Sequence, residues 1–185
     1  MRLFLAILFE EPVKDKLCET MELIQKNTRE SRLTLRENLH LTLVFLGEVQ
    51  TTRTIREAMK EIRTGPFSLE IQGLGRFRRD GGDLYWAGIT LTPPLRSLYL
   101  ELKNALENKG FSIDDRPYRP HLTLARQVVE KPEIPFYTLK NYLAPIKTKA
   151  AAVSLMKSER VGGKLVYTEL CRKELEENKR EGEIL

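Results

Sequence analysis

The amino-acid sequence predicts an α+β fold in which antiparallel β-sheets carry helices on their outer faces. Three observations support this prediction. The chain has 185 residues, 41% hydrophobic and 31% charged, as expected of one globular domain with a core. The order strand, helix, strand, strand occurs twice along the chain. The connections between these segments are mostly short, which favours antiparallel sheets.

The first half of the chain opens with an apolar run at residues 3–9, which is typical of a buried strand. Pro12 suits the first turn of the helix that follows. The inner face of this helix is predicted from helical spacing to hold Val13, Leu17, Met21 and Ile24. After the polar stretch 26–31, the pattern predicts strands at 32–36 and 39–45, a helix at 51–63 and a strand at 67–71.

The second half repeats this order. It begins with a strand at 84–91, and Pro93-Pro94 then opens a helix that Gly110 is suited to end. A strand at 121–126 follows. The proline-rich stretch 132–145 is predicted to be mostly loop with one short helix, and strands are expected near 148–157 and 164–171.

Matching positions in the two halves indicate a duplication. Pro12 precedes His40 by 28 residues and Pro94 precedes His121 by 27, so an offset of about 81 residues relates the halves. We therefore expect one domain over residues 1–171, with halves at roughly 1–80 and 81–171. Residues 172–185 are highly charged and are predicted to form a solvated helix extension or a frayed tail.

Composition excludes several classes of protein. No apolar run approaches the ~18 residues of a membrane span. The run 3–9 is followed by Glu10-Glu11 and by no small-residue cleavage site, so it predicts a first strand rather than a signal peptide. Cys18 and Cys171 form no CxxC motif and are expected to be reduced thiols in a cytoplasmic protein. The net charge of +5 permits an anionic partner. A monomer is the default expectation.

Both histidines of the chain begin the same tetrapeptide, His-Leu-Thr-Leu, at His40 and His121. Side chains alternate between the faces of a strand, so His40 shares a face with Thr42, and His121 shares one with Thr123. The leucines point to the other face and into a core. If the two halves face each other, the two pairs line one cleft.

A pair of imidazoles suits phosphoester chemistry. One imidazole can take a proton from an attacking water while the other protonates the leaving oxygen, and a free pKa near 6.5 fits both tasks. Threonine hydroxyls and a nearby arginine can hold the phosphate oxygens. A structural role for each histidine is the alternative. The spacing resembles no metal-ligand motif, and we expect neither metal nor cofactor.

At these motifs the chain resembles the two-histidine (2H) phosphoesterases, and specifically the RNA 2′,3′-cyclic phosphodiesterases, also called 2′-5′ RNA ligases. The likeness covers residues 1–171. It is carried by the opening Met1–Ile7 and by the segments 38–47 and 116–126, which contain the two tetrapeptides. The resemblance implies a two-lobed fold with a cleft between the lobes. It also implies metal-independent hydrolysis of an RNA 2′,3′-cyclic phosphate to a 2′-phosphomonoester.

The resemblance also implies a role for each site residue. His40 matches the family's proton donor to the leaving O3′, and His121 matches the proton acceptor that activates water. Thr42 and Thr123 match the phosphate-binding threonines. Family members can also run the reverse reaction and join RNA ends through a 2′-5′ linkage. Two alternatives stay open: a phosphodiesterase that acts on another cyclic or 2′-5′-linked nucleotide, and a module that binds RNA ends without catalysis.

The strand pattern and the family resemblance make different predictions for the position of Arg126. The family places a phosphate-contacting arginine here, whereas strict alternation puts Arg126 on the face opposite His121. We keep Arg126 as a site residue, so either the strand ends or bulges at Ala125, or Arg126 reaches around the edge. Contact with RNA stays open for five other arginines: Arg76, Arg78, Arg79, Arg116 and Arg119. Phe45 is expected in the core by alternation, while Trp86 and Tyr118 are candidates for stacking on a base.

Overall fold

The computed structural model describes residues 1–177. The elements are β1 (Arg2–Leu8), α1 (Glu11–Asn27), β2 (Thr28–Leu33), the 3₁₀ turn η1 (Arg36–Asn38), β3 (His40–Glu48), α2 (Arg53–Met59), β4 (Phe67–Phe77), β5 (Asp83–Ile89), α3 (Pro93–Glu107), β6 (His121–Glu130), α4 (Phe136–Leu139), β7 (Ile146–Ala150), β8 (Ala152–Val161) and β9 (Lys164–Glu174). The predicted α+β class is confirmed.

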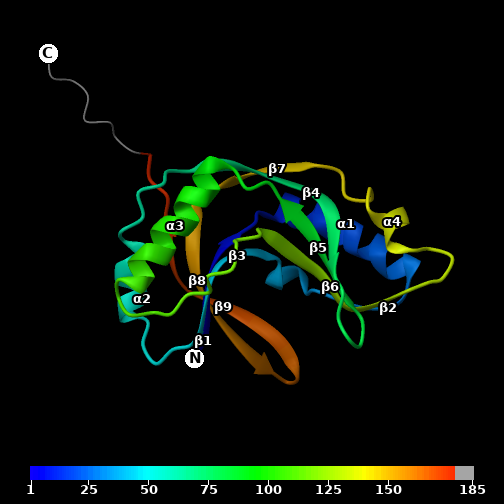
Figure 1. Ribbon diagram of the computed structural model, residues 1–185, viewed down its shortest axis with the longest axis horizontal. Coiled ribbons are helices and arrows are strands. Elements are labelled where there is room, and N and C mark those ends of the chain that lie inside the picture. The colour runs from blue at the N-terminus through cyan, green and yellow to red at the C-terminus, as the bar shows by residue number, and fades with distance from the viewer. Residues whose placement is uncertain (178–185) are drawn as a thin grey trace, which may run out of the picture.

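The strands form two antiparallel sheets (Figure 1), one with the order β3-β1-β8-β9 and one with the order β2-β6-β5-β4-β7. Each sheet contains strands from both halves of the sequence. In each half, the opening strand pairs with the histidine-bearing strand of the same half: β1 pairs with β3, and β5 pairs with β6. On its other side, each opening strand pairs with a strand of the other half: β1 pairs with β8, and β5 pairs with β4. The boundary near residue 80 therefore does not separate the two sheets.

The long helices are exchanged in the same way. Helix α1 follows β1 but packs against β2, β6 and β7 of the five-stranded sheet, whereas α3 follows β5 and packs against β3 and α2 (Figure 1). Apolar residues at helical spacing bury the inner face of α1, as predicted. Gly110, with φ +87°, donates its N–H to the carbonyl of Glu107 and ends α3 in the conformation that glycine favours.

One continuous core joins the two sheets. It includes Leu41 and Leu43 from β3, and Leu122 and Leu124 from β6, each at most 2% exposed. The leucines of both tetrapeptides therefore lie in the core, as predicted. Their burial forces the alternate positions, the histidines and threonines, onto the opposite faces of β3 and β6.

Several predicted segments differ from the structure. The expected strand at 148–157 is two strands, because the chain passes at Ala151 from β7 in one sheet to β8 in the other. The strand predicted at 32–36 is displaced, because β2 covers Thr28–Leu33 and so includes most of the polar stretch 26–31 as an edge strand. Helix α2 covers only Arg53–Met59 of the predicted 51–63.

The C-terminal boundary also differs. Strand β9 continues to Glu174, past the expected end of the domain at 171, and Leu175 is buried. These residues are therefore neither a helix extension nor a frayed tail. Residues 178–185 of the predicted tail lie outside the described part of the chain. None of the helices within residues 1–177 combines the length and hydropathy that a bilayer crossing requires.

Candidate active site

The strands that carry the two histidines contain the same irregularity. In β3, Thr42 pairs with Ala6 and Val44 with Leu5, which leaves Leu43 as an extra residue. In β6, Thr123 pairs with Trp86 and Ala125 with Tyr85, which leaves Leu124 extra. Each bulge produces two successive buried residues and reverses the later alternation. Arg126 is therefore exposed on the face of His121 and Thr123, as a bulge in this strand requires.

The bulge in β3 has the same consequence for Phe45, which occupies the position equivalent to Arg126, and here it overturns the prediction. Phe45 was expected in the core, but its side chain is 50% exposed. The guanidinium of Arg2 lies 5.1 Å from the centroid of its ring. The core prediction for Phe45 was wrong because strict alternation ignores the extra residue at Leu43.

Strands β3 and β6 lie against each other, so the two tetrapeptides meet. Two reciprocal hydrogen bonds join them. The hydroxyl of Tyr118 donates to the carbonyl of Thr42 at 3.0 Å, and the hydroxyl of Thr34 donates to the carbonyl of Thr123 at 2.9 Å. Each motif strand is thus held by a residue that precedes the motif of the other strand. We call the four side chains of His40, Thr42, His121 and Thr123 the histidine site.

Both imidazoles are oriented in the same way. The Nδ1 atom of His40 lies 2.7 Å from the carbonyl of Asn38, and that of His121 lies 2.7 Å from the carbonyl of Arg119. A carbonyl only accepts hydrogen bonds, so Nδ1 carries the hydrogen in both rings. In the neutral form, Nε2 is then the basic nitrogen of each ring. In the protonated form, the same atom carries the proton that can leave.

The surroundings of His40 are apolar. Its ring contacts Phe4 and Tyr167, with centroids 4.9 and 5.1 Å away, and Phe4 belongs to a small buried cluster with Ala6 and Met156. This burial lowers the pKa of His40 from its ordinary 6.5, and the hydrogen bond to Asn38 offsets the effect only in part. The charges of Arg126 and His121 lower the pKa further. Arg126 therefore lies within electrostatic reach of the histidine site.

Thr42 completes the contacts of His40, because its hydroxyl oxygen lies 2.9 Å from Nε2. With the imidazole neutral, the hydroxyl donates to this nitrogen. With the imidazole protonated, the donor and acceptor exchange, and the threonine hydrogen is released for another acceptor.

His121 lies in a second aromatic setting. Its ring is 5.4 Å from Phe77 and 5.9 Å from Trp86, centroid to centroid. The indole of Trp86 covers Gly75, where a Cβ atom would lie only 2.1 Å from the indole ring. Any side chain at position 75 would therefore displace Trp86 from its place beside His121.

Two of the five open arginines have partners within the protein. Arg76 forms ion pairs with Asp83 and Glu130 and lies over the ring of Phe136, so it is a structural residue. Arg116 pairs with Asp114 and thereby lowers the pKa of that carboxyl to about 2. The side chains of Arg78, Arg79 and Arg119 form no ion pair with another residue of 1–177. Arg119 contributes through its backbone carbonyl, which orients His121.

The side chain of Tyr118 also has partners within the protein. Its ring stacks on Tyr99, with centroids 4.3 Å apart and planes inclined by 5°. Its hydroxyl is the donor to Thr42 described above. Tyr99 occupies one face of this ring, and the hydroxyl joins the two motif strands.

Two contributors to the site were not predicted. Asn38 is buried, orients His40 through its carbonyl, and donates its side-chain amide to the carbonyl of Leu165 at 2.8 Å. Tyr167 of β9 packs edge-on against His40. In the sequence, Asn38 could have been noticed as a polar residue two positions before His40. Tyr167 lies more than 120 residues away in the chain, and no local pattern indicates it.

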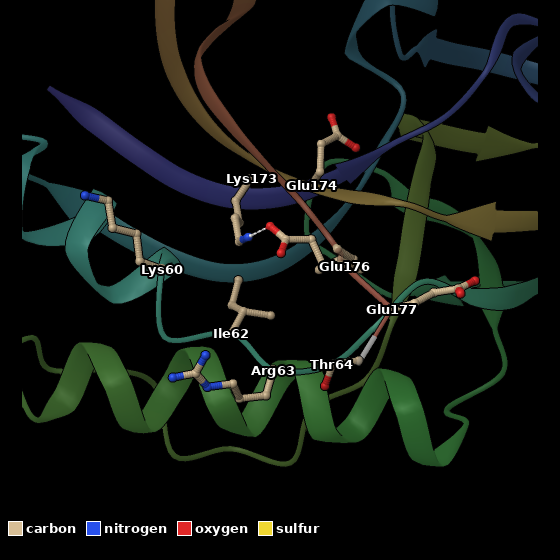
Figure 2. A pocket seen from close by; sticks show the side chains of 9 residues that line it. Lys60, Ile62, Arg63, Thr64, Lys173, Glu174, Glu176 and Glu177 are labelled. Atoms are coloured by element: carbon tan, nitrogen blue, oxygen red, sulfur yellow. Dashed lines mark hydrogen bonds and ion pairs between the residues drawn. The ribbon is translucent and has the colours of Figure 1, made fainter. Parts of the chain in front are cut away.

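The two cavities described lie outside the histidine pair. The larger, of about 660 Å³, lies between the chain at Lys60–Thr64 and the end of the described chain at Lys173–Glu177. Figure 2 shows charges of both signs along it and an ion pair from Lys173 to Glu176. The smaller, of about 330 Å³, is lined in part by Arg126. Within residues 1–177, no three His, Cys, Asp or Glu side chains are grouped as metal ligands.

Comparisons with known proteins agree with this arrangement. A family model described as the 2′-5′ RNA ligase superfamily matches residues 13–162. A Thermotoga maritima protein named RNA 2′,3′-cyclic phosphodiesterase is 38% identical over 131 residues, which are 68% of this chain and 70% of that protein. The structure of TT0787 from Thermus thermophilus has a TM-score of 0.77 at 26% identity, covering 95% of this chain and 98% of its own. Escherichia coli LigT, solved with 3′-AMP, has a TM-score of 0.76 at 27% identity, covering 94% and 97%.

Proposed function

Because this chain belongs to the 2′-5′ RNA ligase superfamily, we propose that it hydrolyses the 2′,3′-cyclic phosphate at an RNA end to a 2′-phosphomonoester. The observation that carries the proposal is the matched setting of His40 and His121. Each imidazole has its Nδ1 atom bound to a carbonyl, and so each offers Nε2 for proton transfer. Binding alone would not require two such rings, because lysine or arginine would hold a phosphate equally well.

In the proposed reaction, His121 accepts a proton from water through Nε2 as the water oxygen bonds to phosphorus. The bond from phosphorus to O3′ breaks, and His40 gives its Nε2 proton to the leaving oxygen. The products are a 2′-phosphomonoester and a free 3′-hydroxyl. If the 5′-hydroxyl of a second RNA replaced water in the attack, the product would be a 2′-5′ linkage between the two strands.

Thr42 links the protonation of His40 to phosphate binding. The lowered pKa leaves His40 neutral in the free protein at neutral pH. A bound phosphate anion favours the charged imidazole and offsets this effect. Once His40 is protonated, its Nε2–H needs an acceptor, and the hydroxyl of Thr42 is free to donate to a phosphate oxygen. Thr123 and Arg126 are proposed to hold the other phosphate oxygens, with Arg126 offsetting charge in the transition state.

The proposal is tested with an end-labelled RNA that carries a terminal 2′,3′-cyclic phosphate, incubated with the protein in excess EDTA. We expect ring opening to a 2′-phosphate without added metal. His40→Ala and His121→Ala should each lower kcat by about 10²–10⁴-fold, the usual contribution of a general acid or base. Arg116→Gln is the matched surface control, because its guanidinium is already paired with Asp114.

The same assay separates the alternatives. A 3′-phosphate product would contradict the proposed leaving oxygen. Turnover that requires metal, or that survives both histidine substitutions, would contradict the two-histidine mechanism. Tight, salt-sensitive binding without turnover would identify a module that binds RNA ends. Turnover restricted to other cyclic or 2′-5′-linked nucleotides would place the activity on a different substrate.

A further inference from the structure

The cavity of about 330 Å³ is connected to the histidine site through Arg126, which lies further along β6 from His121 and Thr123. It lies between β2, the loop that joins β4 to β5, and the bulged part of β6. Its lining includes one arginine from each of these segments: Arg32, Arg79 and Arg126. We call it the arginine cavity. Arg126 belongs to both places, since it lines the cavity and its charge also acts on His40.

The arrangement of these arginines is unfavourable without an anion. Arg32 and Arg126 are paired across the neighbouring strands β2 and β6. Like charges opposite each other on adjacent strands destabilise a sheet. Neither guanidinium forms an ion pair with another residue of 1–177, and the same holds for Arg79. Three arginines that have no ion-pair partner among residues 1–177 therefore line the cavity.

Two acidic residues also line the cavity but do not neutralise it. Asp83 lies 3.5 Å from the guanidinium of Arg76 and accepts the backbone N–H of Arg79 at 3.4 Å, so its charge is already partnered. Asp80 makes no ion pair within residues 1–177. The three arginines therefore outnumber the one unpaired carboxylate.

The backbone around the cavity is held in a fixed arrangement. Gln127 has φ +52° and is the one non-glycine residue with a positive φ among residues 1–177. A Cβ atom on Gly82 would lie 2.7 Å from the backbone of Gln127, so only glycine lets the loop approach β6 this closely. This contact keeps the segment of Arg79 beside that of Arg126, which lowers the cost of ordering the site when a ligand binds.

We propose that the arginine cavity binds the phosphodiester that precedes the cyclic phosphate in an RNA strand. Guanidinium groups suit this ligand because their paired N–H donors match two phosphate oxygens. In an RNA that ends in a cyclic phosphate, every other phosphate lies on the 5′ side of the terminal nucleotide. An anion site that is connected to the histidine site through Arg126 therefore receives the next phosphate in that direction. This inference rests on the proposed function and adds a preference for RNA ends over cyclic mononucleotides.

The test compares a cyclic mononucleotide with a trinucleotide that ends in the same cyclic nucleotide. Arg32→Gln and Arg79→Gln should lower kcat/KM for the trinucleotide about tenfold, as expected for a lost hydrogen bond to a charged group. Both should leave the mononucleotide unchanged. The slope of log affinity against log salt should become shallower by about 0.7 for the lost phosphate contact. Asp80→Asn should act in the opposite direction and favour the trinucleotide.

Arg78→Gln is the matched control, because Arg78 lies in the same loop but does not line the cavity. It should leave both substrates unchanged. Equal losses on the two substrates, or no loss on either, would overturn the phosphodiester site while leaving the proposed function intact. If the wild-type protein hydrolyses neither substrate, the proposed function fails. Binding of a fluorescent trinucleotide then tests the cavity alone, and an unchanged Kd in Arg32→Gln overturns it.

Discussion

At the scale of single residues, the two histidines share an orientation but differ in their surroundings. His40 is enclosed by Phe4 and Tyr167 and bonded to Thr42, whereas no hydrogen bond joins His121 to Thr123 among the described residues. The duplicated motif has therefore acquired two unequal environments. We relate this inequality to the roles proposed for the two histidines, proton donor and proton acceptor, which two identical sites would not favour.

The pKa of His40 is the first quantity that this asymmetry predicts. In an NMR titration of the free protein, His40 should have its midpoint below 6.5, because burial and the charge of Arg126 disfavour the imidazolium. Arg126→Gln removes one positive charge, so the midpoint should rise. Inorganic phosphate bound at the site should also raise it, because an anion favours the charged ring.

Arg116→Gln serves as the control for this titration. Its guanidinium is exposed and paired with Asp114, so the substitution should leave the midpoint of His40 unchanged. A midpoint of His40 at or above 6.5 in the free protein would contradict the description of its surroundings. So would a midpoint that does not respond to Arg126→Gln.

At the scale of elements, the bulges in β3 and β6 determine which side chains reach the site. The periodicity of the sequence predicted the faces of the histidines, threonines and leucines of both tetrapeptides, because none of these lies beyond the extra residue, Leu43 or Leu124. It failed for Phe45, which follows it. The apolar doublets Leu43-Val44 and Leu124-Ala125 were the available signal, since they interrupt the alternation of apolar and polar residues with which each motif begins.

Two other elements show why local pattern was insufficient. Strand β2 carries charged residues in a stretch that resembles a loop, and it forms a strand because it pairs with β6 at the edge of a sheet. Strands β7 and β8 were predicted as one because only Ala151 separates them in the sequence. Their separation depends on pairing with β4 and β1, which are distant in the sequence.

The loop between β4 and β5 provides a prediction about stability. Gly81 and Gly82 both have a positive φ, but a Cβ atom on Gly81 would meet nothing within 4 Å, whereas one on Gly82 would collide with the backbone of Gln127. We expect Gly81→Ala to lower the free energy of unfolding by about 1 kcal/mol through strain in the backbone alone. Gly82→Ala should cost about 2–3 kcal/mol, because the loop must also move away from β6.

Urea denaturation of the two variants measures this difference directly. Equal losses of stability would show that the approach of Gly82 to Gln127 contributes nothing beyond backbone strain. A larger loss in Gly81→Ala than in Gly82→Ala would contradict the arrangement of this loop.

At the scale of the whole molecule, the two halves form a single unit because they exchange both strands and helices. The reciprocal hydrogen bonds of Thr34 and Tyr118 then hold the two motif strands together. The sequence was sufficient to predict the α+β class and the burial of the tetrapeptide leucines, and a bulge was one of the alternatives it offered for Arg126. The exchange of strands between the two halves could not be predicted from the sequence, because the order of elements in a chain does not determine their neighbours in a sheet.

In the proposed mechanism, the two halves supply opposite proton transfers at one phosphate. The most direct test replaces the leaving O3′ of the cyclic phosphate by sulfur, because a thiolate leaves without needing a proton donor. We predict that His40→Ala loses activity on the oxygen substrate but hydrolyses the sulfur substrate at close to the wild-type rate. His121→Ala should lose activity on both. Equal losses of His40→Ala on the two substrates, or rescue of His121→Ala instead, would contradict the assignment.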